Sequence, residues 1–160
     1  MVITNKFKVI KVCVRIIMNI RLMTIDDYKK VFDLWSRTPN IGLNDIDDSI
    51  EGISKYLKRN QNTCFIAEEN TEIIGVILSG HDGRRGFIHH MAVSEFKQRQ
   101  GIGEILLDKA LYALKSEGIQ KVALVVFEKN LKGNSFWEKN GFIAREDLIY
   151  RNRTISDLNK

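Results

Sequence analysis

Proline and cysteine are scarce in this chain: its 160 residues include one proline and two cysteines. Cys13 and Cys64 are far apart and form no metal-ligand pair, so they favour reduced thiols in a cytoplasmic protein over a structural disulfide. No linker rich in proline, glycine or serine divides the chain, and no internal repeat is found. We therefore predict one domain with a sizeable core, because single domains commonly have about 100–200 residues.

Basic clusters and long apolar runs are also lacking. The net charge is only +5 and the basic residues are scattered, whereas nucleic-acid-binding domains carry a clustered basic stripe. Residues 1–17 mix basic and aliphatic side chains, and the segment is too short and too charged to span a membrane. It is either a membrane-surface strand or helix or an extension outside the domain. We favour the extension, and expect a domain over residues 18–152, a tail over 153–160, and neither a nucleic-acid nor a membrane partner.

Metal ligands and a reactive thiol are not indicated either. The three histidines, His81, His89 and His90, have a spacing unsuited to a compact ligand set. Cys64 has no neighbouring histidine in the sequence that could activate it. We therefore expect no metal site and no cysteine nucleophile.

What the chain does contain is a regular alternation of apolar segments and polar turns. The periodicity predicts helices over 24–35 and 45–57 and strands over 63–68, 73–79 and 87–93. An Asp-Gly pair at positions 82 and 83 favours a tight hairpin turn before the last of these strands.

The most informative stretch is 91–118, a strand end followed by a turn and a long amphipathic helix. The apolar residues of this helix that share one face are Ile102, Ile105, Leu106, Ala110, Leu111, Ala113 and Leu114. Gly118 follows them, where a left-handed helix end favours glycine. In the turn, Gly101 and Gly103 let the backbone approach a ligand, and the free N–H groups of the first helical turn favour an anion. The turn is therefore predicted to hold a phosphate group.

Two common phosphate-binding loops are excluded. A Walker A loop has Gly-Lys-Ser/Thr at its end, but Glu104 follows Gly103 here. A dinucleotide-binding fold needs a small residue at position 106, where this chain has Leu106.

Two sequence blocks carry a family resemblance. Met91-Ala92-Val93, then Gln98-x-x-Gly101-x-Gly103 and a helix, resembles the acetyl-CoA-binding motif of the GNAT family of N-acetyltransferases. The later block, which opens with Asn130 and ends with Trp137-Glu-Lys-Asn-Gly141-Phe142, resembles that family's second motif. The resemblance runs from about Ile20 to Tyr150. It implies the α/β (α+β) acyl-CoA N-acyltransferase fold, in which a mixed, mostly antiparallel central sheet has helices on both faces.

The resemblance also implies a cosubstrate and its binding residues. Acetyl-CoA is expected as the acyl donor, with its pyrophosphate at the helix start and its pantetheine arm along the strand edge. A homodimer is possible, since dimerisation is common in the family. The residues expected to bind acetyl-CoA are Met91, Ala92, Val93, Gln98, Arg99, Gln100, Gly101, Ile102, Gly103, Glu104, Asn130 and Trp137. Family analogy assigns the Met91 N–H to the oxyanion of the reacting carbonyl.

A general base is the next requirement, because most amines are protonated at neutral pH. Strict strand alternation predicts two faces, with Phe87, His89 and Met91 on one and Ile88, His90 and Ala92 on the other. We favour His89 over His90 as the base, acting through a water molecule, because some relatives carry a base at that strand position. A histidine that only hydrogen-bonds a neighbour or shapes the pocket is the alternative.

The general acid departs from the family pattern. Many members have a tyrosine where this chain has Trp137, whose indole N–H is no practical proton donor. Either no dedicated acid exists or another hydroxyl serves, and Tyr150, expected on a last strand, is the nearest candidate. The first two helices usually border the acceptor pocket in the family, so Trp35 and Tyr56 are expected there, with core packing as the alternative. The resulting hypothesis is an N-acetyltransferase acting on an unidentified primary amine, and a non-catalytic acyl-CoA-binding module is the second one.

Overall fold

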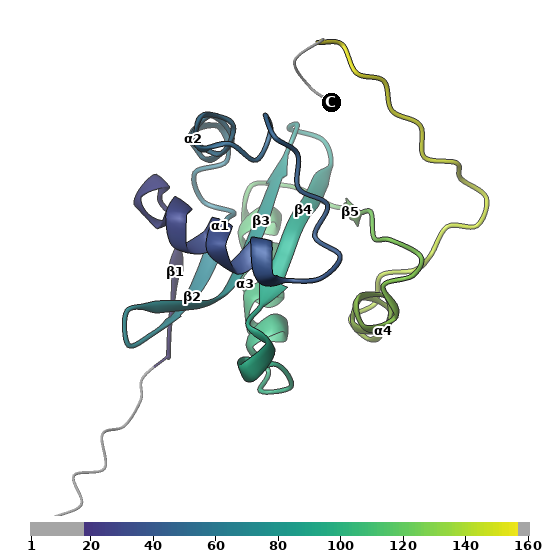
Figure 1. Cartoon of the computed structure of the whole chain (residues 1–160). Helices are drawn as coiled ribbons and strands as arrows, with labels where there is room; N and C mark the ends of the chain where they lie inside the picture. The colour runs from purple at the N-terminus through teal and green to yellow at the C-terminus, as the bar shows by residue number, and fades with distance from the viewer. Residues whose placement is uncertain (1–17, 157–160) are drawn as a thin grey trace, which may run out of the picture.

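The computed structural model describes residues 18–156 of the chain, so the expected extension at 1–17 lies outside the described residues. Within these described residues, five strands and four α-helices follow one another (Figure 1). The strands are β1 (Met18–Leu22), β2 (Phe65–Glu69), β3 (Glu72–His81), β4 (Gly86–Val93) and β5 (Val122–Leu124). The helices are α1 (Tyr28–Arg37), α2 (Ile50–Arg59), α3 (Ile102–Ser116) and α4 (Leu131–Lys139), with short 3₁₀ turns η1 (Ile25–Asp27) and η2 (Glu95–Lys97).

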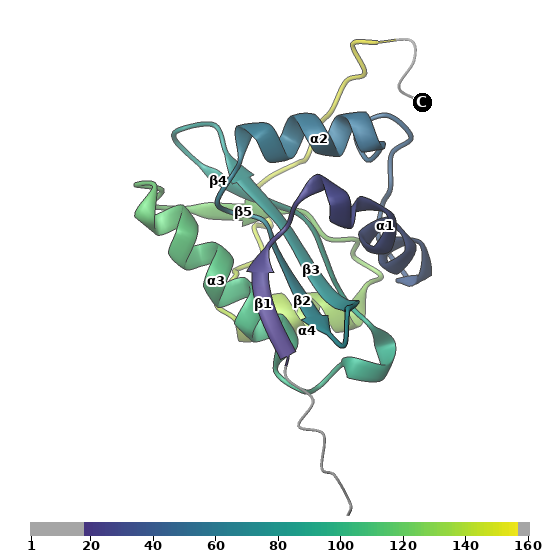
Figure 2. The ribbon, with the colours of Figure 1, turned by 90° about the vertical axis from the view of Figure 1, so that its left-hand side faces the viewer.

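The strands form one sheet in the order β1-β2-β3-β4-β5. The first three pairs are antiparallel and the β4–β5 pair is parallel, because α3 crosses over between those two strands. Helices α1 and α2 lie on one face of the sheet and α3 on the other (Figure 2). The sheet is therefore mixed, mostly antiparallel and covered on both faces, which confirms the expected fold class.

Each face of the sheet has its own hydrophobic core. On the side of α1 and α2, fully buried Val31, Trp35 and Ile53 pack over Ile66 and Val76 of the sheet. On the α3 side the buried residues are Ala67, Ile74, Ile77, Ile88, Ile102, Leu106, Leu107 and Ala110. The amphipathic pattern of α3 predicted the burial of Ile102, Leu106 and Ala110 correctly. It was wrong at Ile105, which is 38% exposed, and it missed Leu107, which is 1% exposed.

The ends of the helices follow local chemistry. Gly101 and Gly118 flank α3 in left-handed conformations, with φ of +80° and +83°, and confirm the predicted turn and helix end. Helix α2 begins at Ile50 rather than at Asp45. The reason is that the Asn44 side chain accepts hydrogen bonds from two backbone N–H groups of a preceding turn, while Ser49 caps the helix by accepting one from the Gly52 N–H.

Strict alternation along β4 was a wrong prediction. The register with β3 shifts where Leu78 pairs with His90 and Ser79 pairs with Ile88, so His89 is the extra residue of a β-bulge. Ile88 consequently packs with Met91 on the α3 side. The rings of His89 and His90 both reach residues of α1 or α2, Tyr56 and Trp35 respectively.

The expected last strand is also absent from the described residues. After α4 and Phe142, residues 143–156 form neither helix nor strand and run away from the sheet in an extended course (Figure 1). Tyr150 is 69% exposed there. The sequence alternates apolar and polar residues weakly in this segment, and no neighbouring strand beyond β5 is present to pair with it.

A partly buried ion pair links β1 to η1 and gives a stability prediction. Arg21 donates to both oxygens of Asp27 at 2.7 and 2.8 Å, and Asp27 is only 7% exposed. Burial raises the pKa of the Asp27 carboxyl, but the Arg21 hydrogen bonds and the Thr24 N–H outweigh it, so this pKa lies below its ordinary value.

Arg21→Leu is expected to lower the free energy of unfolding by about 2 kcal/mol at pH 7, below the roughly 3–5 of a fully buried pair because Arg21 is partly exposed. Because the pKa of Asp27 is lower in the folded than in the unfolded protein, the ionised carboxylate stabilises the fold at pH values above its unfolded-state pKa. This stabilisation is lost as the pH falls through the folded-state pKa. In urea unfolding, the difference in free energy of unfolding between parent and variant should therefore become smaller from pH 7 towards pH 3. Arg145→Leu, which breaks a fully exposed pair with Asp147, is the control and should change nothing. A difference that is constant with pH would contradict this account.

Candidate active site

The site lies where β4 and β5 separate. Their parallel pairing covers only three positions and ends at Ile88 opposite Leu124, whereas β4 continues to Val93. From His89 onward, no strand of the described residues pairs with this edge of β4. Met91, Ala92 and Val93 therefore lie along an open strand edge, as the sequence predicted, and backbone amides there can pair with an extended ligand.

The N-terminus of α3 lies beside this edge. A Cβ placed on Gly103 would come within 3.3 Å of the Met91 Cε and 3.1 Å of the Phe136 ring. Gly103 therefore allows close packing between α3, β4 and α4, a role that the sequence did not indicate. Gly101, at the N-cap of α3, differs from Gly103. Its φ is positive, and no atom lies within 4 Å of a Cβ placed on it.

The first turn of α3 presents the donors that the sequence predicted. The N–H groups of Ile102, Gly103 and Glu104 have no carbonyl partner within the helix, since the first such bond runs from Ile105 to the Gly101 carbonyl. Together with the helix dipole they fit an anionic group. Open space over Gly101 makes room for a pyrophosphate, so these residues fit acetyl-CoA.

The preceding turn is held by its own side chains. Gln98 donates to the Val93 carbonyl at 3.2 Å and Gln100 to the Phe96 carbonyl at 3.3 Å, so both are structural in this turn. Arg99 is exposed, and its guanidinium has no hydrogen-bond partner among residues 18–156. Lys97 is paired with Glu69, so of these two cations only Arg99 carries an uncompensated charge near the helix start.

Asn130 and Trp137 lie at the start and along the length of α4. The Asn130 Oδ1 accepts from the Gly133 N–H at 2.9 Å and caps the helix, while its Nδ2 has no acceptor among the described residues. Trp137 packs edge-to-face between Phe136 and Phe142, with ring centroids 5.0 and 5.2 Å away. Trp137 is thus part of an aromatic cluster next to the start of α3, and no hydroxyl replaces the family's tyrosine at that position.

The bulge at His89 places two histidines on the α1/α2 side of the separation. His89 is exposed, with its ring 5.2 Å from Tyr56 and 4.8 Å from Phe87. Although His89 is exposed, the surrounding atoms desolvate its charged form and lower its pKa, and repulsion from the neighbouring His90 ring lowers it further. His89 is therefore neutral near pH 7 and can accept a proton.

His90 is engaged by a residue that sequence reasoning missed. Its Nε2 lies 2.7 Å from the Asp48 Oδ1, and Asp48 is 5% exposed. The other Asp48 oxygen accepts from the Asn44 N–H at 2.7 Å, and the His90 ring lies 5.0 Å from Trp35. His90 is therefore fixed, whereas His89 has no hydrogen bond to a described residue. An aspartate in a loop gave no periodic signal by which this pair could have been found.

A hollow of about 350 Å³ opens beside His89. Its lining residues are Tyr56, Arg59, Asn60, Gly80, His81, Asp82, Arg85, Gly86, Phe87, His89 and Ala123. Tyr56 thus borders the hollow as expected, whereas Trp35 is 1% exposed in the core and confirms the alternative of core packing. Tyr150 is not among the lining residues.

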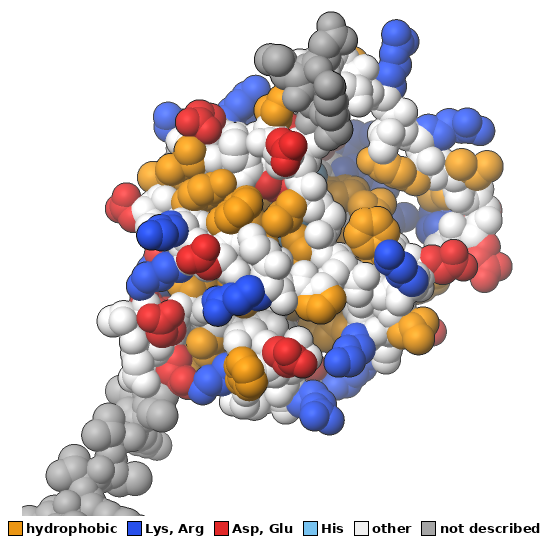
Figure 3. All heavy atoms as spheres, in the orientation of Figure 1, with side chains coloured by type: hydrophobic (Ala, Val, Ile, Leu, Met, Phe, Trp, Pro, Cys, Tyr) orange, Lys and Arg blue, Asp and Glu red, His pale blue; other side chains and the backbone are white. Residues whose placement is uncertain are grey.

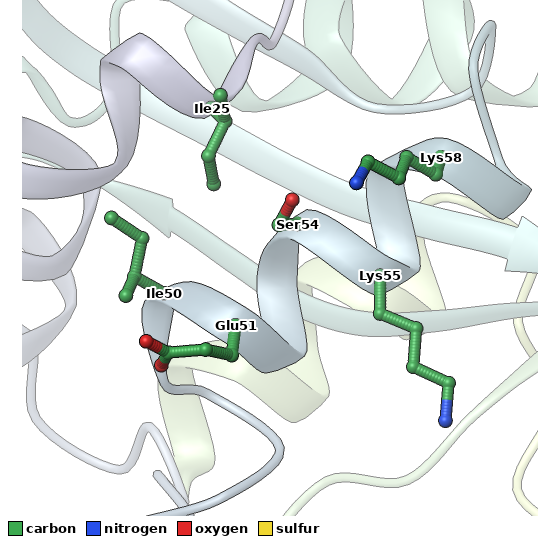
Figure 4. Close-up of a pocket in the computed structure, with 6 residues that line it drawn as sticks. All are labelled: Ile25, Ile50, Glu51, Ser54, Lys55 and Lys58. Atoms are coloured by element: carbon green, nitrogen blue, oxygen red, sulfur yellow. The ribbon is translucent and has the colours of Figure 1, made fainter.

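A larger hollow of about 600 Å³ lies elsewhere, between η1 and α2. In Figure 4, Ile25, Ile50 and Ser54 face this space and Lys55 points away from it. No residue of β4 or of the α3 start lines it, so it lacks the groups of the candidate site. Within residues 18–156 no set of three His, Cys, Asp or Glu side chains could hold a metal ion, and no described helix is long and apolar enough to cross a membrane.

The parallel β4–β5 pair opens beside a helix N-terminus in a mostly antiparallel sheet, as expected for the acyl-CoA N-acyltransferase fold. The chain belongs to the acetyltransferase (GNAT) family, whose sequence profile matches residues 28–142. It is 29% identical over 140 residues to acetyltransferase ECA0875 of Pectobacterium atrosepticum, covering 88% of this chain and 98% of that protein.

Solved structures share the fold. Ard1 from Thermoplasma volcanium is 19% identical with a TM-score of 0.69, over 78% of this chain and 81% of that one. The PaiA N-acetyltransferase from Thermoplasma acidophilum, solved with coenzyme A, is 22% identical with a TM-score of 0.67, over 78% and 88% of the two chains.

Proposed function

We propose that this enzyme transfers the acetyl group of acetyl-CoA directly to a primary amine. The observation that carries the proposal is the open edge of β4, which has the α3 N-terminus beside it and the unpartnered His89 at its start. Acetyl-CoA supplies an acyl thioester, which an unprotonated amine can attack.

The chain supplies binding and charge stabilisation. The first-turn N–H groups of α3 hold the pyrophosphate, the edge of Met91, Ala92 and Val93 pairs with the amides of the pantetheine arm, and Asn130 Nδ2 donates to that arm. The Met91 N–H serves as oxyanion donor, a role typically worth roughly 3–4 kcal/mol of the barrier.

Proton transfer falls to His89. Because its pKa lies below the ordinary histidine value, the ring is unprotonated near pH 7 and can take the amine proton, directly or through water. His81 is unsuited to the role of base, because its Nδ1 accepts from the Gly83 N–H at 3.0 Å and its Nε2 lies 2.6 Å from Glu117. No dedicated acid is needed if the CoA thiolate leaves unprotonated, and neither Trp137 in its aromatic cluster nor exposed Tyr150 is positioned as one.

The proposal is tested by CoA thiol release over a panel of primary amines, together with calorimetric titration of acetyl-CoA. We expect binding and amine-dependent release. Binding without release on any amine would favour the non-catalytic acyl-CoA-binding module, and absence of binding would reject both.

Asn130 allows its two roles to be separated. Asn130→Asp keeps an oxygen that can cap α4 but removes the N–H donor and adds a negative charge. We expect the melting temperature to stay near that of the parent and the affinity for acetyl-CoA to fall roughly 10-fold or more. Asn130→Ala, which loses the cap as well, should also cost about 1 kcal/mol of stability. Unchanged affinity in Asn130→Asp would restrict Asn130 to capping.

A further inference from the structure

The hollow beside His89 has an unbalanced set of charges. Arg59, the last residue of α2, and Arg85, from the β3–β4 turn, both line it, and neither guanidinium has a hydrogen-bond or ion-pair partner among the described residues. On the face shown in Figure 3, by contrast, basic and acidic side chains are interspersed. Two unpaired arginines in one small concavity are therefore a local feature.

One carboxylate, that of Asp82, lines the same hollow, and a second, that of Glu117, lies next to it. The Asp82 Oδ1 accepts from the N–H groups of Arg84 and Arg85 at 2.8 and 2.7 Å. Glu117, next to the rim, accepts from Asn62 and lies 2.6 Å from the His81 Nε2. Glu117 thus has side-chain partners and Asp82 holds its own turn but keeps its charge, so two guanidiniums without partners among residues 18–156 face one carboxylate in the lining of the hollow.

The walls between the two arginines are fixed. Asn60 donates to the Tyr56 carbonyl at 3.2 Å and accepts from the His81 N–H at 3.1 Å, which ties the end of α2 to the end of β3. The Asn60 amide and the Tyr56 hydroxyl lie where a Cβ on Gly80 would stand, at 2.4 and 2.5 Å. The backbone next to Arg59 is therefore fixed relative to the end of β3, from which the turn that carries Arg85 begins.

We infer that the acceptor is a small amine that also carries an oxyanionic group, a carboxylate or a phosphate, which Arg59 and Arg85 bind while its amine lies at His89. The inference rests on the proposed function. Guanidinium groups bind carboxylates and phosphates through paired N–H donors, and the volume of about 350 Å³ suits a molecule of amino-acid size. A polycationic acceptor would meet two arginines without partners against the single carboxylate, Asp82, among the residues that line the hollow.

The experiment offers matched amines to the full chain: ω-amino acids of two to six carbons, their carboxamides, the corresponding aminoalkyl phosphates, and diamines. CoA thiol release gives KM and kcat, and calorimetry in the presence of CoA measures binding without turnover. We expect acids or phosphates to have a KM roughly 10-fold or more below that of the carboxamides and diamines. Whether carboxylate or phosphate is preferred identifies the anion.

Arg59→Gln and Arg85→Gln should each remove this preference by raising KM for the anionic amines, with little change for the carboxamides. Arg84→Gln, in the same turn but outside the hollow, is the matched control and should keep it. Carboxamides or diamines that perform as well as the acids, or a preference that survives both arginine variants, would overturn the inference while leaving N-acetyl transfer intact. If the parent bound the anionic amines but released no CoA thiol, and both arginine variants abolished that binding, the anion site would be upheld and the acetyl transfer rejected.

Discussion

Gly101→Val is expected to lower the affinity for acetyl-CoA by about 10²–10⁴-fold, because two charge-assisted backbone hydrogen bonds are lost at roughly 1.5–3 kcal/mol each. Gly101 has a φ of +80° and open space where a side chain would stand. A branched side chain disfavours this conformation and fills the space over the first turn of α3. Calorimetric titration of acetyl-CoA measures the loss directly.

The same helix provides a matched control. Gly118, at the other end of α3, has a φ of +83° and equally open surroundings. Gly118→Val should therefore cost a similar amount of stability, on the order of 1–2 kcal/mol, and leave acetyl-CoA binding unchanged. If both variants bound acetyl-CoA equally well, the α3 N-terminus would not be the pyrophosphate site.

The features that the sequence predicted well are those set by local chemistry. Gly101 and Gly118 mark the two ends of α3 because a left-handed backbone strongly favours glycine, and the apolar spacing between them defines the buried face. The open edge at Met91 to Val93 was inferred from family resemblance, and the short β5 agrees with it.

The features that it missed depend on tertiary contacts. The bulge at His89 arises from the register between β3 and β4, which alternation within one strand cannot reveal. The pair of Asp48 and His90 joins residues 42 positions apart, and Gly103 is small because Phe136 of α4 packs against it. Each of these depends on a partner distant in sequence.

His89→Gln is expected to lower kcat/KM by about 10²–10⁴-fold, the usual contribution of a general base. Desolvation, and then repulsion from the neighbouring His90 ring, lower the pKa of His89 below the ordinary value of about 6.5. The parent should therefore keep full activity down to a pH below that value and lose it as His89 becomes protonated. The pH–rate profile of the variant should lack this loss of activity at low pH, the acidic limb. Its affinity for acetyl-CoA, measured by calorimetry, should equal that of the parent.

The pH profile distinguishes a base from a residue that only shapes the hollow. Glutamine retains much of the side-chain volume beside Tyr56 and Phe87 but cannot take up a proton near neutral pH. A shaping role predicts a smaller rate loss at every pH, with the acidic limb preserved. His81→Gln is the control, because His81 lines the same hollow but has both ring nitrogens engaged, and its variant should keep the limb. If the acidic limb of the pH–rate profile persisted in His89→Gln and disappeared in His81→Gln, the proton acceptor would be His81, which lies beside Glu117.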